Sequence, residues 1–440
     1  MRVGVVGTGY VGLVAGACFS DVGNHVICVD VDEAKIAKLR EGEIPIYEPG
    51  LAEIVQRNAK AGRLEFTTDL AHATANSLIM FLAVGTPQAD DGSADLSALL
   101  SVAGQIAKVM DGYRIIVTKS TVPVGTHKKI GDVVKAATDH PFDCVSNPEF
   151  MKEGAALDDF MKPDRVVIGT TNPAVVEIMK QLYSAFMRKR ERILVMDPAS
   201  AEMTKYAANA LLATKVSFMN EIANLCERYG ADVELVRAGV GSDSRIGHPF
   251  LFPGVGYGGS CFPKDVSALV SMGREVDYIP LITQAAQDTN QKQRRHFAQR
   301  VIERFEKGKG PLTLAVWGLA FKGRTDDIRE APAITAIQMF LKNGVTIRAH
   351  DPEAMPNTRR TLGETGITYH EDGYEALSGA DGLVIFTDWQ EFRVPEFDLM
   401  KKNLRRPVVF DGRNLYDPAF MKRMGFEYHS VGRPTAGQCG

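Results

Sequence analysis

The residue best suited to covalent chemistry is a cysteine at the end of a glycine-rich segment. Four of the six residues 254–259 (GVGYGG) are glycine, so the backbone before Cys261 can fold tightly around a ligand. Pro263 suits the first turn of a helix that residues 266–272 would continue. A thiol at a helix N-terminus beside Lys264 lies in an electropositive setting that favours the nucleophilic thiolate. We therefore expect Cys261 to be a nucleophile; the alternative is an ordinary small buried residue.

Two further pairs of polar residues could take part in catalysis. Lys205 and Asn209 are four positions apart in a helical segment, so they share one face and could polarise a carbonyl group or hold an oxyanion. Glu149 and Glu153 follow a strand and could supply a base and a group that binds hydroxyls. A solvated lysine or a solvated charged turn is the alternative explanation for each pair.

A dinucleotide-binding turn is predicted at the N-terminus. Residues 7–12 (GTGYVG) lie between a strand and a helix, where Gly7 permits a tight turn and Gly9 lets a pyrophosphate approach the helix N-terminus. Gly12 allows the helix to pack closely on the strand. Asp30 ends the next strand, where a carboxylate accepts ribose hydroxyls and repels a 2′-phosphate. The pattern favours NAD over NADP; a glycine-rich structural turn is the alternative.

These residues must be positioned by an alternation of short apolar strands and helices, which predicts a parallel, doubly wound sheet over the first 200 residues. The expected strands are residues 2–6, 25–30, 77–84, 113–120, 142–146 and 165–169, and the expected helices are residues 12–22, 33–41 and 96–110. Ligands bind at the carboxyl ends of such strands. Thr86 and Thr121 follow two of them and are candidate cofactor contacts, although each could equally belong to a simple turn.

A long helix over residues 199–230 and further helical sequence to about residue 307 separate this region from a second alternation. There the expected strands are residues 312–317, 345–350, 382–387 and 407–411, with a helix over residues 332–343. We therefore predict an NAD-binding Rossmann-like domain (1–198), a central long helix with further helical sequence (199–306) and a second Rossmann-like domain (312–430). Residues 307–311 would be a linker and residues 431–440 a flexible tail.

Composition excludes several classes of protein. The 440 residues carry a formal charge of −3, too close to neutral for a general nucleic-acid clamp. The longest apolar run, residues 78–84, is far shorter than the roughly 20 residues of a membrane helix. Six cysteines without CxxC spacing indicate reduced thiols of a cytoplasmic protein, and nine histidines without HExxH spacing give a metal site no support. Glycines interrupt the N-terminal apolar stretch, so it is not expected to be a signal peptide.

Five motifs in order, GxGxxG, NPEFxxEG, EMxKYxxNA, GGSCxPKD and GLAFKxxTDDxRE, resemble the nucleotide-sugar 6-dehydrogenases of the UDP-glucose/GDP-mannose dehydrogenase family over nearly the whole chain. The resemblance implies two Rossmann-like domains joined by a long central helix. It implies that residues 199–306 include a helical dimerisation region and that residues 312–430 bind the nucleotide-sugar. It also implies an NAD-dependent, four-electron oxidation of UDP-glucose to UDP-glucuronate through a thiohemiacetal and a thioester on Cys261. Only the resemblance selects this substrate, because glycine-rich backbone and dispersed cations recognise a pyrophosphate without revealing the base.

The same resemblance implies roles for individual residues. Asp265 matches a water-linked base, Lys205 assists proton transfer and stabilises oxyanions, and Glu149 activates water for thioester hydrolysis. Thr121 and Asn209 position water and substrate. The implied NAD contacts are Gly7, Gly9, Tyr10, Val11, Gly12, Asp30, Lys35, Gly85, Thr86, Thr121, Glu153, Lys264 and Arg329. The implied substrate contacts are Glu149, Phe150, Met151, Lys152, Glu153, Lys205, Asn209, Arg245, Phe250, Leu251, Phe252, Pro253, Gly254, Gly258, Phe321, Lys322 and Arg413.

Arg245 matches an arginine that a partner subunit can deliver, which implies a homodimer built on the long helix. Phe252 and Asn414 depart from residues found in some relatives, Lys and Arg respectively, which leaves the detail of pyrophosphate binding open. Three alternatives remain at this point: a GDP-mannose or UDP-N-acetylhexosamine 6-dehydrogenase with the same mechanism, a two-electron hydroxy-acid dehydrogenase, and an NAD-binding redox sensor with a regulatory cysteine.

Overall fold

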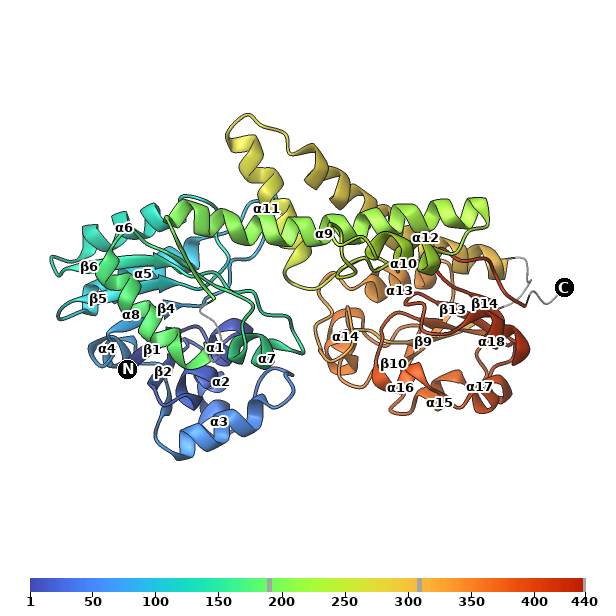
Figure 1. Ribbon diagram of the computed structural model, residues 1–440. Coiled ribbons are helices and arrows are strands. Elements are labelled where there is room, and N and C mark those ends of the chain that lie inside the picture. The colour runs from blue at the N-terminus through green and yellow to red at the C-terminus, as the bar shows by residue number, and fades with distance from the viewer. Residues whose placement is uncertain (188–191, 307–310, 438–440) are drawn as a thin grey trace. The chain divides into compact units, whose positions relative to one another are not determined.

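The computed structural model describes residues 1–187, 192–306 and 311–437, and its chain forms two compact units (Figure 1). Unit 1 comprises Met1–Ala208 and Ser267–Ile279, and unit 2 comprises Asn209–Val266 and Pro280–Gly440. The predicted central region (199–306) is thus divided between the two units. Within the described part of the chain, the helices are all too short or too polar to span a membrane.

Unit 1 is built on an eight-stranded sheet with the order β3-β2-β1-β4-β5-β6-β7-β8. The strands are β1 (Arg2–Val6), β2 (His25–Val29), β3 (Leu64–Thr67), β4 (Ile79–Leu82), β5 (Arg114–Thr118), β6 (Phe142–Ser146), β7 (Val166–Gly169) and β8 (Ile193–Met196). Strands β1 to β6 pair in parallel, as predicted. The prediction is wrong at β7, which meets β6 in antiparallel fashion at Ser146 and Gly169 and pairs in parallel with β8.

Helices cover both faces of this sheet, because alternate strand residues enter two different cores. Val5 and Phe81 belong to one core, whereas their neighbours Val6 and Leu82 belong to the other. Buried residues of α1, α2, α3, α7 and α8 fill the first core, and those of α4, α5 and α6 fill the second. These helices are α1 (Tyr10–Asp21), α2 (Glu33–Arg40), α3 (Leu51–Lys60), α4 (Leu70–Ala75), α5 (Ser97–Val109), α6 (Thr126–Ala137), α7 (Ala156–Met161) and α8 (Pro173–Tyr183). Strands buried on both faces explain the continuous apolar runs of the sequence.

Unit 2 contains a six-stranded sheet with the order β11-β10-β9-β12-β13-β14, in which every pairing is parallel. Its strands are β9 (Thr313–Trp317), β10 (Thr346–His350), β11 (Ile367–Tyr369), β12 (Gly382–Ile385), β13 (Val408–Asp411) and β14 (Glu427–His429). Its smaller helices are α13 (Pro332–Lys342), α14 (Met355–Leu362), α15 (Gly373–Leu377), α16 (Gln390–Arg393), α17 (Phe397–Asn403) and α18 (Pro418–Arg423). The second Rossmann-like sheet is therefore confirmed, with β11 and β14 added at its edges.

Four further helices lie between the two sheets in the sequence. They are α9 (Pro198–Tyr229), α10 (Val233–Gly241), α11 (Phe262–Glu275) and α12 (Leu281–Glu306). The predicted site residues Lys205 and Asn209 lie on α9, and Lys264 and Asp265 lie on α11. Helix α9 coincides with the predicted long helix and ends before Gly230, whose φ of +71° belongs to the left-handed region that glycine readily adopts.

The predicted flexible tail is wrong in its first part. Val431 and Arg433 are buried, and Tyr428 and Ala436 exchange backbone hydrogen bonds of 2.9 and 3.1 Å. Arg433 also donates to the hydroxyl groups of Ser430 and Tyr428. These contacts hold residues 431–436 on the edge of the second sheet. Residues 307–310 of the predicted linker and 438–440 of the tail lie outside the described residues.

Candidate active site

The glycine motif of unit 1 forms the predicted strand-to-helix turn. Gly7 has a φ of +99°, and its N–H donates to the carbonyl of Val29 (2.8 Å). A Cβ at Gly12 would lie 1.9 Å from the carbonyl oxygen of Gly7, so only glycine permits this approach of α1 to β1. The position of a Cβ at Gly9 has no neighbour within 4 Å, which leaves the N-terminus of α1 open to a ligand. This cradle fits a dinucleotide pyrophosphate.

Asp30 lies at the end of β2, as predicted, and is tied to the turn. Its carboxylate accepts hydrogen bonds from the N–H and hydroxyl of Thr8 (2.9 and 2.7 Å) and from Lys35 (3.0 Å). Burial opposes ionisation, but the bonds from Thr8 and Lys35 outweigh it and lower the pKa of Asp30 to about 2. Asp30 is therefore a carboxylate at neutral pH, as an acceptor for ribose hydroxyls must be.

The loops after β4 and β5 are joined to each other. The hydroxyl of Thr86 donates to the carbonyl of Thr121 (2.8 Å), and the hydroxyl of Ser120 donates to the carbonyl of Val84 (2.6 Å). Both threonines are buried at the carboxyl ends of parallel strands, where ligands of such sheets bind. The structure thus brings together two predicted cofactor contacts that are 35 positions apart.

Glu149 and Lys205 form a buried ion pair in unit 1. The Lys205 Nζ lies 3.0 Å from Glu149 Oε1, and only 4% and 5% of the two side chains are exposed. Glu149 also accepts from the N–H of Met151 (2.6 Å). Burial disfavours its charge, but Lys205, the Met151 N–H and Lys119 together lower the pKa of Glu149. An ionised carboxylate beside an ammonium group can serve as a base next to a stabiliser of negative charge.

The loop after Glu149 is fixed by a carboxylate that the sequence reasoning missed. Glu48 accepts from the N–H groups of Gly154 (2.7 Å) and Ala156 (2.8 Å), and the hydroxyl of Tyr10 also donates to it. Glu48 is buried, so these bonds are shielded from water. Through Glu48, the first turn of α1 is connected to the loop that carries Glu153. The four consecutive residues 47–50 (YEPG) are the sequence signal that could have drawn attention to this position.

The ring of Phe150 is flanked by two cations. The guanidinium of Arg165 lies 3.8 Å from the ring centroid, and the Lys205 ammonium lies 5.3 Å from it. Such cation–π contacts restrict the ring and the cations together. Arg165 was not predicted as a site residue; it gives the substrate-loop residue Phe150 a defined orientation.

In unit 2, Cys261 directly precedes α11, as predicted. Its carbonyl accepts from the N–H of Asp265 (2.8 Å), and its sulfur lies 3.6 Å from the hydroxyl oxygen of Ser260. The thiol is partly exposed, whereas Cys18, Cys28 and Cys226 are buried. Position and accessibility suit a nucleophile.

Asp265 is fixed by two predicted site residues. Its side chain is almost fully buried and accepts from Asn209 Nδ2 (2.6 Å) and Lys264 Nζ (2.6 Å). Asp265 lies in the first turn of α11, four residues after Cys261, so the predicted base and the predicted nucleophile lie together at the start of one helix.

The glycine-rich segment before Cys261 is held on several sides. Asn220 on α9 accepts from the N–H of Gly254 (2.8 Å), and Asn290 on α12 exchanges two hydrogen bonds with Tyr257 (2.8 and 3.0 Å). A Cβ at Gly258 would lie 2.2 Å from the carbonyl oxygen of Glu330. The glycines therefore permit close packing of this loop against the rest of unit 2, in addition to any role in binding.

The end of β9 and the loop after β13 meet in unit 2. Arg413 donates to the carbonyls of Phe386 (2.7 Å) and Phe321, so it fixes the predicted substrate residue Phe321. The buried Asp351 accepts from the N–H groups of Leu319 (2.7 Å) and Ala320 (3.2 Å). The amides at this strand end are thus occupied by a side chain, unlike the open turn at Gly9.

Several predicted contacts are engaged elsewhere or exposed. Arg245 is 87% exposed and pairs with Asp243 (2.6 Å), and Arg329 pairs with Asp327 (2.8 Å).

The predicted site residues are distributed over both units. Unit 1 holds the predicted residues Gly7, Gly9, Tyr10, Val11, Gly12, Asp30, Lys35, Gly85, Thr86, Thr121, Glu149, Phe150, Met151, Lys152, Glu153 and Lys205. Unit 2 holds Asn209, Arg245, Phe250, Leu251, Phe252, Pro253, Gly254, Gly258, Cys261, Lys264, Asp265, Phe321, Lys322, Arg329 and Arg413.

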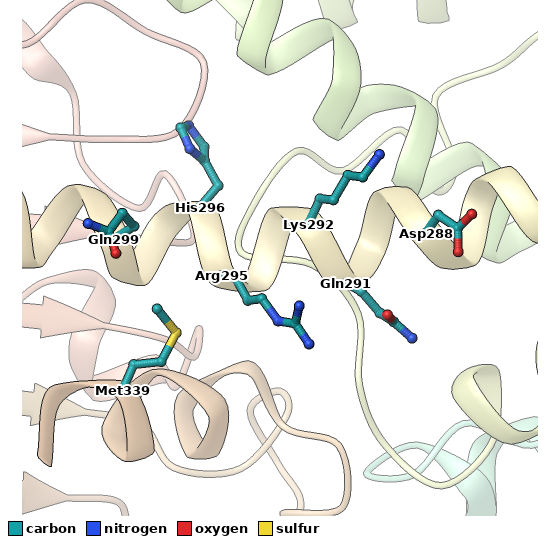
Figure 2. Close-up of a pocket in the computed structure, with 7 residues that line it drawn as sticks. All are labelled: Asp288, Gln291, Lys292, Arg295, His296, Gln299 and Met339. Carbon is teal, nitrogen blue, oxygen red and sulfur yellow. The ribbon is translucent and has the colours of Figure 1, made fainter. Parts of the chain in front are cut away.

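A pocket of about 560 Å³ lies along α12 and α13 of unit 2 (Figure 2). Lys292 and His296 extend from one side of α12, whereas Gln291 and Arg295 extend from another. The described residues that line it are Asp288, Gln291, Lys292, Arg295, His296, Gln299 and Met339. Five of these seven residues are exposed and polar, and the predicted site residues are not among them.

Comparison with known proteins agrees with this arrangement. The NAD binding domain of the UDP-glucose/GDP-mannose dehydrogenase family matches residues 1–187, the central domain matches residues 199–292, and the UDP binding domain matches residues 315–418. The chain is 47% identical to the UDP-glucose 6-dehydrogenase of Pseudomonas aeruginosa, with 100% of this chain and 99% of the relative covered. It is 46% identical to the UDP-glucose 6-dehydrogenase TuaD of Bacillus subtilis, with 99% and 94% covered.

Solved structures show the same similarity. A UDP-glucose dehydrogenase from Pyrobaculum islandicum superposes with a TM-score of 0.91 at 37% identity, covering 98% of this chain and 97% of that one. A UDP-D-ManNAc dehydrogenase from Pyrococcus horikoshii reaches a TM-score of 0.86 at 27% identity, with 98% and 99% covered. Together with the NAD-type turn and the cysteine before α11, these matches establish that the chain belongs to the UDP-glucose/GDP-mannose dehydrogenase family.

Proposed function

We propose that this protein is a UDP-glucose 6-dehydrogenase that oxidises UDP-glucose to UDP-glucuronate with two equivalents of NAD. The similarity over the full length to UDP-glucose 6-dehydrogenases supports the substrate, and the family's NAD binding domain together with Asp30 supports the cofactor. The observation that carries the proposed mechanism is a partly exposed cysteine at the start of α11, one turn before a buried Asp265.

The proposed reaction has three stages. The carbon-6 alcohol of the sugar first loses a proton and a hydride and becomes an aldehyde. The Cys261 thiolate then adds to this aldehyde, and loss of a second hydride from the thiohemiacetal leaves a thioester. Water finally cleaves the thioester, which releases the carboxylate and restores the thiol. Bound NAD supplies the hydride acceptor for each of the two oxidations.

Each proposed role matches the environment of the residue. Asp265, held by Asn209 and Lys264, would accept protons through water. Lys205 would stabilise negative oxygen atoms of the tetrahedral species. Glu149, whose pKa is lowered although it is buried, would be ionised and able to activate water.

An assay of product and stoichiometry tests the proposal. The purified protein is incubated with NAD and, in separate reactions, with UDP-glucose, GDP-mannose and UDP-N-acetylhexosamines. The amount of NADH formed is quantified, and the mass of the sugar product is determined by mass spectrometry. We expect two NADH per UDP-glucose and a product with a carboxylate at carbon 6. One NADH per substrate would instead indicate a two-electron dehydrogenase, and turnover of another donor alone would reassign the substrate.

We also propose a homodimer built on α9. Three large apolar side chains on this helix, Leu211, Phe218 and Leu225, are exposed by 64%, 50% and 44% and repeat every seven residues. A seven-residue repeat places them on one stripe of the helix, where a second copy could bury them. Arg245 is exposed and pairs with the nearby Asp243, and we propose that it extends toward the other subunit in the dimer.

A reducing compartment such as the cytoplasm is the proposed location. Cys18, Cys28, Cys144 and Cys226 carry free thiols, as is usual where thiols are kept reduced.

A further inference from the structure

A buried lysine that the proposed mechanism does not use lies behind Glu149. Lys119 directly follows β5 and precedes Ser120 and Thr121. Its backbone N–H donates to the carbonyl of Leu82 (2.9 Å), and only 5% of the residue is exposed. A lysine is almost never buried to this extent unless its charge is compensated, because its ammonium group loses its hydration.

The hydrogen bonds of this ammonium group go to neutral oxygens. Lys119 Nζ donates to Asn147 Oδ1 (3.1 Å) and to the hydroxyl of Tyr183 (3.3 Å), and the Tyr183 hydroxyl donates to the same Asn147 oxygen (2.6 Å). Asn147 is also fixed through its side-chain N–H₂, which donates to the carbonyl of Val167 (2.7 Å). Lys119 Nζ lies 5.7 Å from the ring centroids of both Phe160 and Tyr183.

The charge that compensates Lys119 comes from Glu149, two residues after Asn147. The pKa of Lys119 is lowered to about 8: burial and the like charge of Lys205 lower it, and the charge of Glu149 partly offsets them. In return, Lys119 helps Lys205 and the Met151 N–H to lower the pKa of Glu149 against the effect of burial. Lys205 from α9 and Lys119 from the end of β5 thus both favour the charged form of Glu149. Lys205 is paired directly with this carboxylate, whereas Lys119 donates to Asn147 and Tyr183 and acts on Glu149 through its charge.

We propose that Lys119 is a positioning residue for Glu149: it anchors Asn147 at the start of the Glu149 loop and supplies the second buried positive charge that keeps this carboxylate ionised. The inference rests on the proposed function, in which Glu149 activates water for thioester hydrolysis. Hydrogen bonding alone does not require a cation at this position, because a neutral donor could satisfy Asn147 at a smaller cost of desolvation. The charge itself is therefore the functional feature.

The test separates charge from hydrogen bonding. Lys119→Met removes the charge and the donor, Lys119→Arg keeps a charge, and Tyr183→Phe removes a hydrogen bond to the same Asn147 oxygen but leaves the charge in place. The release of UDP-glucuronate is followed in single turnovers as a function of pH. A base acts only when it is ionised, so the rate falls as the pH drops through the pKa of Glu149. We expect Lys119→Met to raise the pH at which this rate falls to half of its maximum by about one pH unit. The other two variants should leave this midpoint unchanged.

A second measurement does not depend on turnover. Infrared difference titration of the Glu149 carboxylate, assigned with Glu149→Gln, is expected to show the same upward shift in Lys119→Met. An unchanged midpoint of the pH profile in Lys119→Met, or an equal shift of the midpoint in Tyr183→Phe, would overturn the proposal. If Lys119→Met does not fold, Lys119→Gln replaces it, since its amide can still donate to Asn147 without a charge. A wild-type protein without turnover would refute the proposed function, while the titration would still decide whether Lys119 acts on Glu149.

Discussion

Cys261 is the residue on which the proposed four-electron reaction depends. Without a thiol there is no covalent adduct to retain the aldehyde and present its carbon–hydrogen bond for the second oxidation. Cys261 before α11 is partly exposed, whereas Cys18 and Cys28 are buried, and burial raises the pKa of each of these two thiols. Burial also raises the pKa of the Cys144 thiol within β6. The position before a helix therefore distinguishes the proposed nucleophile from thiols that stay protonated.

Cys261→Ser tests this distinction. We expect the variant to lose UDP-glucuronate formation by at least about 100-fold, because a serine hydroxyl is a much weaker nucleophile than a thiolate near neutral pH. The measurement is the rate of acid formation by mass spectrometry. Cys144→Ser, a change of the same atoms at a site outside the proposed machinery, is the control. Acid production at the wild-type rate by Cys261→Ser would refute the covalent route.

The Glu149–Lys205 pair should make stability depend on pH in a definite direction. The pKa of Glu149 is lower in the folded state than its ordinary value of 4.5. The stabilisation by its charge is therefore complete above pH 4.5 and is lost as the pH falls through the folded-state pKa. We expect the difference in unfolding free energy between wild type and Glu149→Gln to stay constant above pH 5 and to shrink below it, by at most about 1.4 kcal/mol per pH unit. Urea unfolding across this range measures it, and a difference that grows on acidification would contradict the argument.

At the scale of elements, the loops that carry the proposed site are held by side chains from other elements. Glu48 precedes α3 and binds the amides of Gly154 and Ala156, so it fixes the loop that ends at α7. Asn220 from α9 and Asn290 from α12 do the same for the glycine-rich segment of unit 2. Positions within loops are defined here by buried acceptors, because a buried N–H without a partner is costly.

Glu48→Ala would remove one of these acceptors. We expect a loss of about 2 kcal/mol in unfolding free energy, since the buried N–H groups of Gly154 and Ala156 lose their partner. Because the loop also carries Glu149 and Glu153, the KM values for UDP-glucose and NAD should rise several-fold. Chemical unfolding and steady-state kinetics provide the measurements. Glu53→Ala, which changes an exposed glutamate on α3, is the matched control. Equal effects of the two substitutions would contradict the conclusion that Glu48 fixes this loop.

At the scale of the whole molecule, the apolar stripe of α9 predicts self-association. The side chains of Leu211, Phe218 and Leu225 expose apolar surface on a helix whose other side is built into the fold. Burial of such surface is worth about 25 cal/mol per Å² before the cost of association. A second copy of the same helix offers an identical stripe, which is the requirement of a twofold interface.

Phe218→Asp tests the dimer. A charge in the centre of the stripe is expected to weaken association by at least about 100-fold, equivalent to ~2.7 kcal/mol, and to shift the protein to monomer in sedimentation velocity at micromolar concentration. Val394→Asp introduces the same charge at a more exposed apolar residue of unit 2 and should leave the association state unchanged. A monomeric wild-type protein would reject the proposed dimer outright.

Local features of the protein could be predicted from the sequence by itself. The turn at Gly7, the position of Cys261 before a helix, the limits of α9 and the central strands of both sheets follow from neighbouring residues, because turn conformation, helix ends and buried apolar runs are short-range properties. The strands that escaped prediction, β3, β8, β11 and β14, are the edge strands of the two sheets and lack the continuous buried run of the central strands.

Only the tertiary structure decided which polar groups meet. Lys205 and Glu149 are 56 positions apart, as are Asn209 and Asp265, and nothing near either residue specifies its partner. The same holds for Glu48 with Gly154, for Lys119 with Asn147, and for the reversal of β7. Sheet order and helix packing determine these encounters over long distances in the chain, and a buried charge takes its properties from the partner that the fold brings to it.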